Sequence, residues 1–428
     1  LVVATQAIAQ TPAGSVTATF PATPIGRAMS QWLDAFNSGD SAQLGAFYRK
    51  YAMQRSLEQQ MRVRAQTGGF ELESIETSEP RLLEFVVRER NGGRRAFAVS
   101  ELSSDAEPTM VQSSLAPIPA GSTIADFGID AAARARVVEE AIAKLESNYV
   151  FPAVAAKMAD TVRARLRRGT YDRITNGLTF ASTLTQHFQE VSRDKHLRVN
   201  FFPAGAPRRP LEPTPARRPS TVTDPERCGF VRMDKLEGNV GYLKFNFFAS
   251  PDECGDAATT AVTQVTDADA LIIDLRENGG GDPAMVAHIS SYLFSKRTHL
   301  NDIWERPGDK TEHFYTNPEL PGRKLGDDKP VYVLTSNRTF SGAEEFSYNL
   351  KNLKRATIVG ETTGGGAHPV NGHRIADKFM IGVPFARAIN PITKTNWEGT
   401  GVAPDVKVPA GDALVVALKL ISDKRATP

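Results

Sequence analysis

The chain has 428 residues, a length that predicts two to four domains at roughly 100 to 200 residues each. Apolar residues make up 41% and charged residues 23%, and no run of about 18 apolar residues occurs, so the composition fits a globular protein and excludes a disordered chain, a collagen and a membrane-spanning helix. The 51 Lys and Arg residues nearly balance the 49 Asp and Glu residues, and the formal net charge of +2 gives no electrostatic reason to expect nucleic acid or an anionic membrane as a partner.

Residues 1–19 are expected to be the remnant of a secretory signal followed by a disordered lead. The sequence LVVATQAIAQTPAG has an apolar stretch and then the small-x-small tripeptide at 7–9, which is typical of the end of a signal peptide. The basic segment of such signals does not precede it, so a frayed first helix is the alternative. A signal peptide predicts a periplasmic or secreted protein.

Residues 20–116 are expected to form an α+β domain. From Pro24 to Tyr48 apolar residues recur at spacings of three and four, interrupted at 38–40, which predicts two amphipathic helices joined by a turn. After Gly69 four short alternating runs are separated by turn residues, a pattern typical of an antiparallel sheet. With the segment WLDAFNSGD, this arrangement resembles the cone-shaped ketosteroid-isomerase-like fold. No catalytic constellation is found there, so a docking or accessory module is expected.

Three further segments follow along the chain. Residues 122–202 predict a helical bundle, because three stretches rich in helix-forming residues have helical periodicity. Residues 203–226 are rich in proline and arginine and predict an exposed loop. Residues 227–422 predict an α/β core with parallel strands, since the apolar runs ALIIDLR, VYVLTS and ATIVGE alternate with helical segments.

Cys228 and Cys254 are the only cysteines of the chain. In an exported protein such a pair is a disulfide candidate, with two free thiols as the alternative. No cluster of Cys and His has the ligand spacing of a zinc site, so neither a metal nor a cofactor is expected.

The glycine run after the expected strand ALIIDLR, at 270–276, is the first segment that suggests chemistry. In Asn278-Gly279-Gly280-Gly281 the backbone can turn sharply and present N–H groups to an oxyanion or a phosphate. The spacings of dinucleotide-binding and Walker loops are absent. A purely structural turn is the alternative.

Ser341 lies between the expected strand VYVLTS at 331–336 and a helix that is expected to begin near Gly342. At the N-terminus of a helix, free N–H groups and the macrodipole favour a developing negative charge. The spacing of Ser341 and Glu344 also fits a capping box, so the position alone does not separate a nucleophile from a cap. A nucleophilic serine needs a base within reach and a group that orients the base.

Four segments together, DLRENGGG, SNRTFSGAEE, ATIVGETTGGGAHP and NWEGTGVAPDV, resemble in order and spacing the family of tail-specific or C-terminal processing serine peptidases. This family includes tricorn protease and the interphotoreceptor retinoid-binding protein, and the likeness extends from residue 129 to near 420. The resemblance implies a crotonase-like α/β core, with the nucleophile on the Ser-Gly-Ala-Glu turn at Ser341.

Within the family, the chain is similar to the tricorn and retinoid-binding branch. Processing proteases have a Lys in a Gly-Lys-Gly setting, where this chain has glycines at 364–366. In the other branch a histidine matches His196, and a carboxylate in a Glu-Gly-x-Gly-Val motif matches Glu398. The segment 203–226 is too short for the PDZ module of processing proteases, so their tail specificity is not implied.

The expected function is that of a serine endopeptidase which forms an acyl-enzyme with a peptide or protein substrate. His196 would take the proton of Ser341 and Glu398 would fix the tautomer of His196, in a cleft between bundle and core. The N–H groups of Gly342 and of one glycine in 279–281, with Gly280 preferred, would form the oxyanion hole.

Alternatives remain at the level of the residue and of the function. His368 is a second candidate for the base, whereas Glu361 is expected to order its own loop. A non-catalytic carrier of an apolar, retinoid- or lipid-like ligand is a rival function, because retinoid-binding members of the family have that role. An esterase or amidase for small acyl substrates would use the same triad.

Overall fold

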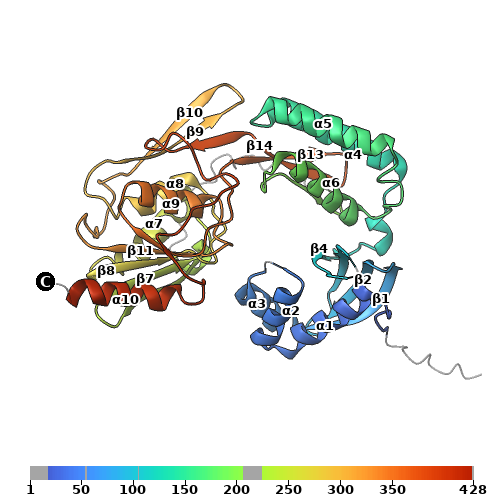
Figure 1. Ribbon diagram of the computed structural model, residues 1–428, viewed down its shortest axis with the longest axis horizontal. Helices are drawn as coiled ribbons and strands as arrows, with labels where there is room; N and C mark the ends of the chain where they lie inside the picture. Colours follow the sequence, from blue (N-terminus) through green and yellow to red (C-terminus); the bar gives the residue numbers. More distant parts are fainter. Residues whose placement is uncertain (1–17, 54, 105, 206–223, 427–428) are drawn as a thin grey trace, which may run out of the picture. The chain divides into compact units, whose positions relative to one another are not determined.

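The computed structural model describes residues 18–53, 55–104, 106–205 and 224–426 (Figure 1). The chain is a mixed α+β protein and divides into two compact units, Leu1–Asp126 and Phe127–Pro428, hereafter the first and the second unit. The signal remnant expected at 1–19 lies almost wholly outside the described residues, as does most of the loop expected at 203–226. Both stay predictions, as do the finer domain boundaries.

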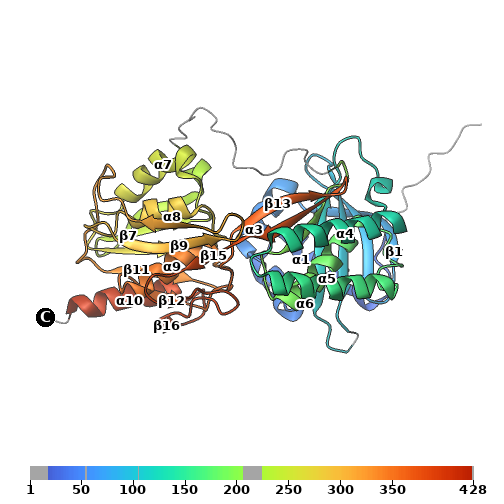
Figure 2. The ribbon, with the colours of Figure 1, turned by 90° about the horizontal axis from the view of Figure 1, so that it is seen from above.

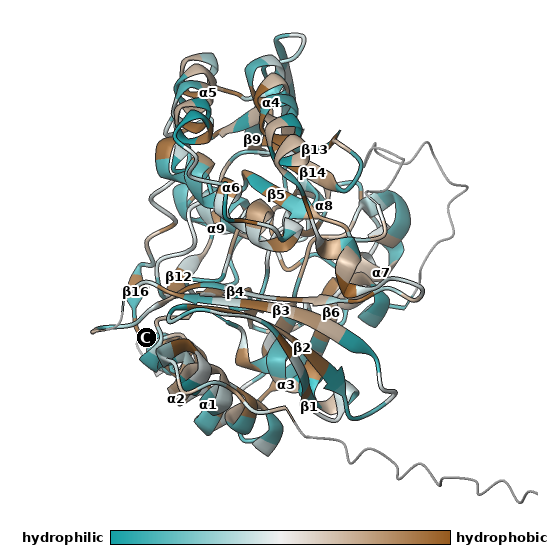
Figure 3. Ribbon diagram, turned by 90° about the vertical axis from the view of Figure 1, so that its right-hand side faces the viewer, coloured by the Kyte–Doolittle hydropathy of each residue, from teal (hydrophilic) through white to brown (hydrophobic). Residues whose placement is uncertain are grey.

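The first unit packs helices against one four-stranded antiparallel sheet. The turn at 38–40 separates the first two helices, because Gly39 adopts a φ of 73° and the Asp40 carboxylate accepts hydrogen bonds from the first turn of the next helix. Figure 3 shows hydrophobic residues along the two central strands. The elements are α1 (Pro24–Ser38), α2 (Ser41–Lys50), α3 (Leu57–Thr67), β1 (Phe70–Ser78), β2 (Leu82–Glu89), β3 (Arg95–Leu102) and β4 (Met110–Pro117), with strand order β1-β2-β3-β4.

Helix α3 was not expected from the sequence. It has a polar composition, and Thr67 is its one buried residue, so the periodic apolar pattern that identifies a surface helix is missing. The Ser56 side chain nevertheless caps it by accepting a hydrogen bond from Gln59 N–H. The identification of this unit with the ketosteroid-isomerase-like fold stays a prediction.

The second unit begins with helices that pack against a small sheet. Strand β5, which follows α6, pairs with the hairpin of β13 and β14 from much later in the chain, in the order β13-β14-β5. This pairing, which was not expected from the sequence, brings residues 194–198 close to the loop that precedes β13 (Figure 3). Figure 2 shows β13 of the same hairpin beside α4. The elements are η1 (Ile124–Phe127), α4 (Ala131–Asn148), α5 (Pro152–Arg167), α6 (Gly177–Ser192), β5 (Arg198–Phe201), β13 (Val370–Ile375) and β14 (Phe379–Pro384).

A six-stranded sheet with order β16-β12-β11-β8-β7-β6 forms the core of the second unit. All neighbouring pairs are parallel except β6 with β7, and the strands β8 and β11 are buried along their whole length. Alternate residues of the strands face two layers: Leu243 and Ile273 pack with α7, α8 and α9, whereas Tyr242 and Ile272 pack with α10 (Figure 1). A smaller sheet has the order β10-β9-β15. The elements are η2 (Glu226–Cys228), β6 (Phe230–Leu236), β7 (Val240–Phe245), α7 (Pro251–Thr263), β8 (Ala270–Asp274), α8 (Pro283–Ser290), β9 (His299–Glu305), β10 (Lys310–Tyr315), β11 (Val331–Thr335), α9 (Gly342–Asn352), β12 (Thr357–Gly360), β15 (Ala386–Ile389), β16 (Val406–Lys407) and α10 (Ala413–Ala426).

Cys228 and Cys254 form a disulfide that joins η2 to α7, with an S–S distance of 1.98 Å. Within the described ranges, every helix is too short or too polar to cross a bilayer.

Candidate active site

Ser341 occupies a sharp turn between strand β11 and helix α9. Its backbone has φ 53° and ψ −122°, a conformation that a residue with a Cβ adopts at a cost of about 1 to 3 kcal/mol. Backbone strain of this kind clusters at functional sites, and a strand-turn-helix elbow is a known way of exposing a nucleophilic serine. The backbone at Ser341 therefore favours a nucleophile over a simple helix cap.

The buried carboxylate of Glu344 holds this turn in place. It accepts a hydrogen bond from Ser341 N–H at 2.9 Å, which is one half of the expected capping box. It also accepts hydrogen bonds from the Thr363 hydroxyl at 2.5 Å, from Gly365 N–H at 2.6 Å and from Gly366 N–H at 2.8 Å. Burial raises the pKa of Glu344, and these hydrogen bonds act in the opposite direction. Glu344 thus connects the serine turn to the loop at 363–369.

The glycine run packs directly against the serine turn. A Cβ at Gly280 would lie 2.6 Å from Gly342 N and 2.7 Å from Phe340 O, so only glycine fits there. The N–H of Gly280 donates to Asn278 Oδ1 at 2.8 Å and is therefore already used. A Cβ on Gly342 would lie 3.1 Å from Gly281 N, so these two glycines are close together. Neither the N–H of Gly281 nor the N–H of Gly342 has an acceptor among the described residues. The structure favours Gly281, in place of the expected Gly280, as the partner of Gly342 in an oxyanion hole.

His196 lies just before β5, next to the serine turn. Its ring packs against Phe340 with a centroid distance of 4.6 Å, and a Cβ on Gly366 would lie 2.6 Å from its Cε1 atom. Both ring nitrogens are buried without a hydrogen-bond partner among the described residues. Burial lowers the pKa of His196 to about 4, although Asp194 acts in the opposite direction. The imidazole is therefore neutral at neutral pH, as a general base must be.

Asp194 is the carboxylate that lies nearest to His196, with 3.7 Å between Asp194 Oδ1 and His196 Nδ1. Its side chain is 1% exposed and accepts hydrogen bonds from His196 N–H at 3.0 Å and from the Tyr149 hydroxyl at 3.3 Å. No role was expected for Asp194 from the sequence. The signal that could have found it is the spacing Asp-x-His, because an aspartate readily accepts a hydrogen bond from the backbone two residues later.

Glu398, the expected third member of the triad, also lies in this cluster. Asp194, His196 and Glu398 each offer one atom that could bind a metal ion, and these three atoms all lie within 4.8 Å of one another, which is close enough to hold a cation. Glu398 Oε2 accepts a hydrogen bond from Ala367 N–H at 2.6 Å, and its Oε1 is buried without a partner among the described residues. Burial and the charge of Asp194 raise the pKa of Glu398 to about 7, while His368 acts in the opposite direction.

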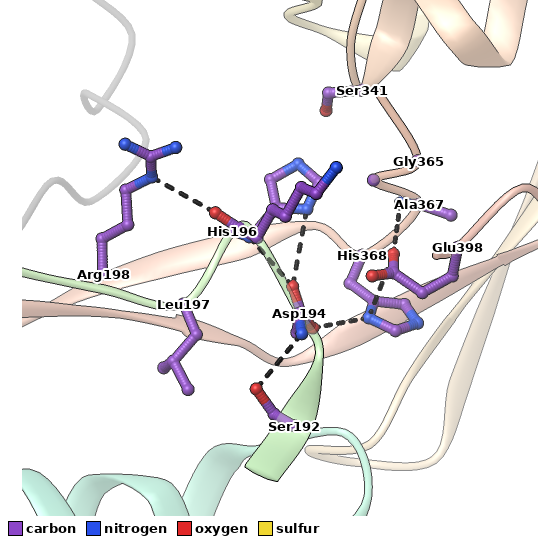
Figure 4. A network of polar contacts seen from close by, with 12 residues as sticks. Ser192, Asp194, His196, Leu197, Arg198, Ser341, Gly365, Ala367, His368 and Glu398 are labelled. Carbon is purple, nitrogen blue, oxygen red and sulfur yellow. Dashed lines mark hydrogen bonds and ion pairs between the residues drawn. The ribbon is translucent and has the colours of Figure 1, made fainter. Parts of the chain in front are cut away.

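His368, the alternative base, is buried behind Asp194. Its Nδ1 lies 2.6 Å from Asp194 Oδ2 and 3.4 Å from Glu398 Oε2. Figure 4 shows the Ser341 hydroxyl on the side of the His196 ring, with Asp194 between His196 and His368. The arrangement favours His196 as the base.

Glu361 lies apart from this cluster of side chains. Its carboxylate accepts hydrogen bonds from Asn337 N–H at 3.2 Å and from Ala410 N–H at 3.1 Å, and so connects the turn after β12 to two other loops.

Two family models match most of the second unit. The model of peptidase family S41 matches residues 239–408, and the model of the N-terminal domain of peptidase S41 in eukaryotic IRBP matches residues 131–230. The chain belongs to peptidase family S41, which confirms the family predicted from the four motifs.

Curated relatives share the family but are longer than the matched segment. The carboxy-terminal processing protease CtpB of Bacillus subtilis is 26% identical over 185 residues, which cover 43% of this chain and 37% of that protein. The chloroplastic carboxyl-terminal-processing peptidase 2 of Arabidopsis thaliana is 24% identical over 178 residues, which cover 40% and 32%. The matched part thus spans about a third of the length of these relatives.

Similar solved structures include two peptidases. A putative peptidase from Parabacteroides merdae is 18% identical with a TM-score of 0.48, over 67% of this chain and 96% of that chain. The tricorn protease is 13% identical with a TM-score of 0.45, over 82% and 41%.

Proposed function

We propose that the second unit is a serine endopeptidase that cleaves peptide or protein substrates through an acyl-enzyme on Ser341. The observation that carries the proposal is the meeting of three features at one turn: a strained serine, a buried neutral imidazole packed beside it, and two backbone N–H groups that have no acceptor among the described residues. The same four motifs support a crotonase-like fold for the core sheet.

The chemistry follows from the position of each group. His196 takes the proton of the Ser341 hydroxyl as the serine oxygen attacks the substrate carbonyl. The negative charge on the carbonyl oxygen is stabilised by the N–H groups of Gly342 and Gly281. The peptide bond breaks when His196 returns the proton to the departing amine. A water molecule then hydrolyses the ester by the same route, with no cofactor in the reaction.

Asp194 is the better candidate for the group that orients His196. A buried imidazole that accepts a proton needs a nearby negative charge, because burial strongly disfavours the imidazolium. Asp194 lies closest and already fixes the backbone at His196. Glu398 contributes a second, more distant carboxylate, so its role in the proposed triad is shared with Asp194.

Labelling with a fluorophosphonate probe tests the nucleophile. The wild-type chain should be labelled and should cleave an unfolded protein substrate, and Ser341→Ala should lose both properties because the proposed acyl-enzyme forms on the Ser341 hydroxyl. Ser422→Ala, an exposed position on α10, is the matched control and should behave as the wild type. Labelling or full cleavage by Ser341→Ala would overturn the assignment.

The two rival functions give different outcomes in the same assay. An esterase for small acyl groups would be labelled and would hydrolyse small esters, but would leave peptides intact. A carrier of an apolar ligand would show no turnover and would purify with a lipid-like molecule. Either result would replace the proposed peptidase.

A periplasmic or secreted location is also proposed. The disulfide between Cys228 and Cys254 supports it, since disulfides persist in oxidising compartments and are rare in the cytosol.

A further inference from the structure

The hairpin of β9 and β10 gathers two histidines and an aspartate outside the proposed active site. His299 Nε2 and His313 Nδ1 each lie 2.6 Å from the same oxygen, Asp302 Oδ1. All three donor atoms lie within 4.8 Å of one another. The side chains are 30%, 55% and 17% exposed for His299, His313 and Asp302, so an ion can reach them from solvent.

A β-bulge brings these residues to one face of the hairpin. Residues three apart on a regular strand point to opposite faces, which would separate His299 from Asp302. Here Asp302 pairs with His313 and Asn301 with Phe314, but the next pair joins His299 to Tyr315 and leaves Leu300 as an extra residue. Leu300 and Asn301 are accordingly both buried, although they are consecutive. The bulge thus reverses the direction of His299, and bulges commonly have this effect next to functional sites.

The ring of His299 is held in a fixed orientation. It stacks on Tyr315 with a centroid distance of 4.5 Å and an interplanar angle of 18°. The guanidinium of Arg297 lies over the Tyr315 ring at 3.7 Å from its centroid, which keeps this positive charge on the aromatic face. The direction of His299 Nε2 towards Asp302 is therefore set before any ligand binds.

We propose that His299, Asp302 and His313 bind one divalent transition-metal ion of the Zn²⁺ class. Two imidazole nitrogens and a carboxylate oxygen form a donor set that zinc uses with water in the fourth position. Tetrahedral ligands at about 2.0 to 2.2 Å from zinc lie roughly 3.3 Å apart, so the His–Asp contacts need to open by less than about 1 Å. The ion would take the place of the two contacts to Asp302, with each neutral imidazole binding through His299 Nε2 or His313 Nδ1 and carrying its proton on the other ring nitrogen, and it would join β9 to β10.

No metal was expected from the sequence, because no cluster of Cys and His has the ligand spacing of a zinc site, and the spacing His-x2-Asp-x10-His also matches no common zinc pattern. The site exists only through the pairing of two strands and the bulge at Leu300, neither of which can be read from the spacing.

Zinc binding to the full chain tests this site. The chain is stripped with EDTA, dialysed, and titrated with ZnCl₂ in competition with a chromophoric chelator. The measurements use His196→Ala as the background, because Asp194, His196 and Glu398 also gather three donor atoms. This background should bind one Zn²⁺ per chain, independently of the proposed peptidase activity.

Asp302→Asn and His313→Gln, each added to that background, should weaken zinc binding by at least the 10- to 100-fold that loss of an outer-shell partner typically costs. His373→Gln, on β13 in a different sheet, is the matched control and should leave the affinity unchanged. Circular dichroism checks the fold of each variant, and the more exposed His313 provides the test if the Asp302 variant does not fold. An unchanged affinity in the folded His313→Gln variant, or no bound zinc in the background, would overturn the proposal.

Discussion

At the scale of single residues, the arrangement of charge around His196 is the most informative feature. A histidine with a pKa near 4 is a weak base. The proposed reaction nevertheless requires the imidazole of His196 to carry a full positive charge transiently, when it holds the serine proton. Asp194 opposes the effect of burial on His196, and its own carboxylate is also in contact with His368. The strength of the base therefore depends on a side chain two residues away in the sequence.

Asp194→Asn should lower kcat/KM by about 10²- to 10⁴-fold, the usual range for disturbed general base catalysis. Since Asp194 raises the pKa of His196, its removal should also move the acidic limb of the pH profile below the value of about 4 expected for the wild type. The sign follows because activity requires neutral His196 and is lost as the pH falls through its pKa.

The pH dependence of kcat/KM for a peptide substrate measures both effects of Asp194→Asn. Asp377→Asn, whose side chain is 90% exposed, is the control. Wild-type kinetics in Asp194→Asn would mean that Glu398 alone orients His196.

At the scale of elements, the site depends on the close packing of two turns, one after β8 and one after β11. Both turns follow the carboxyl ends of neighbouring parallel strands, where side chains from different loops meet. This explains why Ser341 and the glycine run could be predicted from sequence, since a buried apolar run followed by turn residues marks such a strand end.

Gly280→Ala should separate these two turns. The added Cβ would meet the backbone of Phe340 and Gly342 at 2.6 to 2.7 Å, and Gly280 has a φ of 97° that alanine rarely adopts. We expect kcat to fall by about 10²- to 10³-fold, the loss typical of one oxyanion donor.

Gly411→Ala is the control for this variant, because a Cβ there would meet nothing within 4 Å. Steady-state kinetics measures the effect, and urea unfolding separates it from a loss of folded protein. A Gly280→Ala variant with normal kcat would show that the two turns need not be in contact.

Other elements could not be predicted because they arise from contacts between distant segments. The pairing of β14 with β5 joins residues 379–382 to 198–201, and neither strand carries a sequence feature that selects the other. Asp194 meets His368, and the bulge at Leu300 forms, only because separate segments of the chain come together. Helix α3 could not be predicted for a local reason: its sequence is polar and buries too little apolar surface to show a periodic apolar pattern.

At the scale of the whole molecule, the second unit has a covalent link on one side of its core. The disulfide closes a loop between residues separated by 26 positions, which connects η2 to α7. Such a loop contributes roughly 3 to 4 kcal/mol to the free energy of unfolding in the chain-entropy model.

The Cys228→Ser, Cys254→Ser double variant should lose about that free energy of unfolding, with the proposed active-site residues still in place. Urea denaturation of wild type and variant, each with and without dithiothreitol, measures the loss. The reductant should lower the stability of the wild type and leave the variant unaffected. Equal stability of the oxidised wild type and the variant would contradict the expected contribution.

The pairing of β5 with the β13–β14 hairpin also has a consequence for the synthesis of the chain. His196 precedes β5, whereas the hairpin that pairs with β5 ends at Pro384, after Ser341. Since synthesis proceeds from the N-terminus, the small sheet is incomplete until the hairpin has left the ribosome. The order of the strands along the chain thus delays the meeting of the proposed base and nucleophile until the chain has been synthesised past Pro384, and a shorter nascent chain has no assembled site.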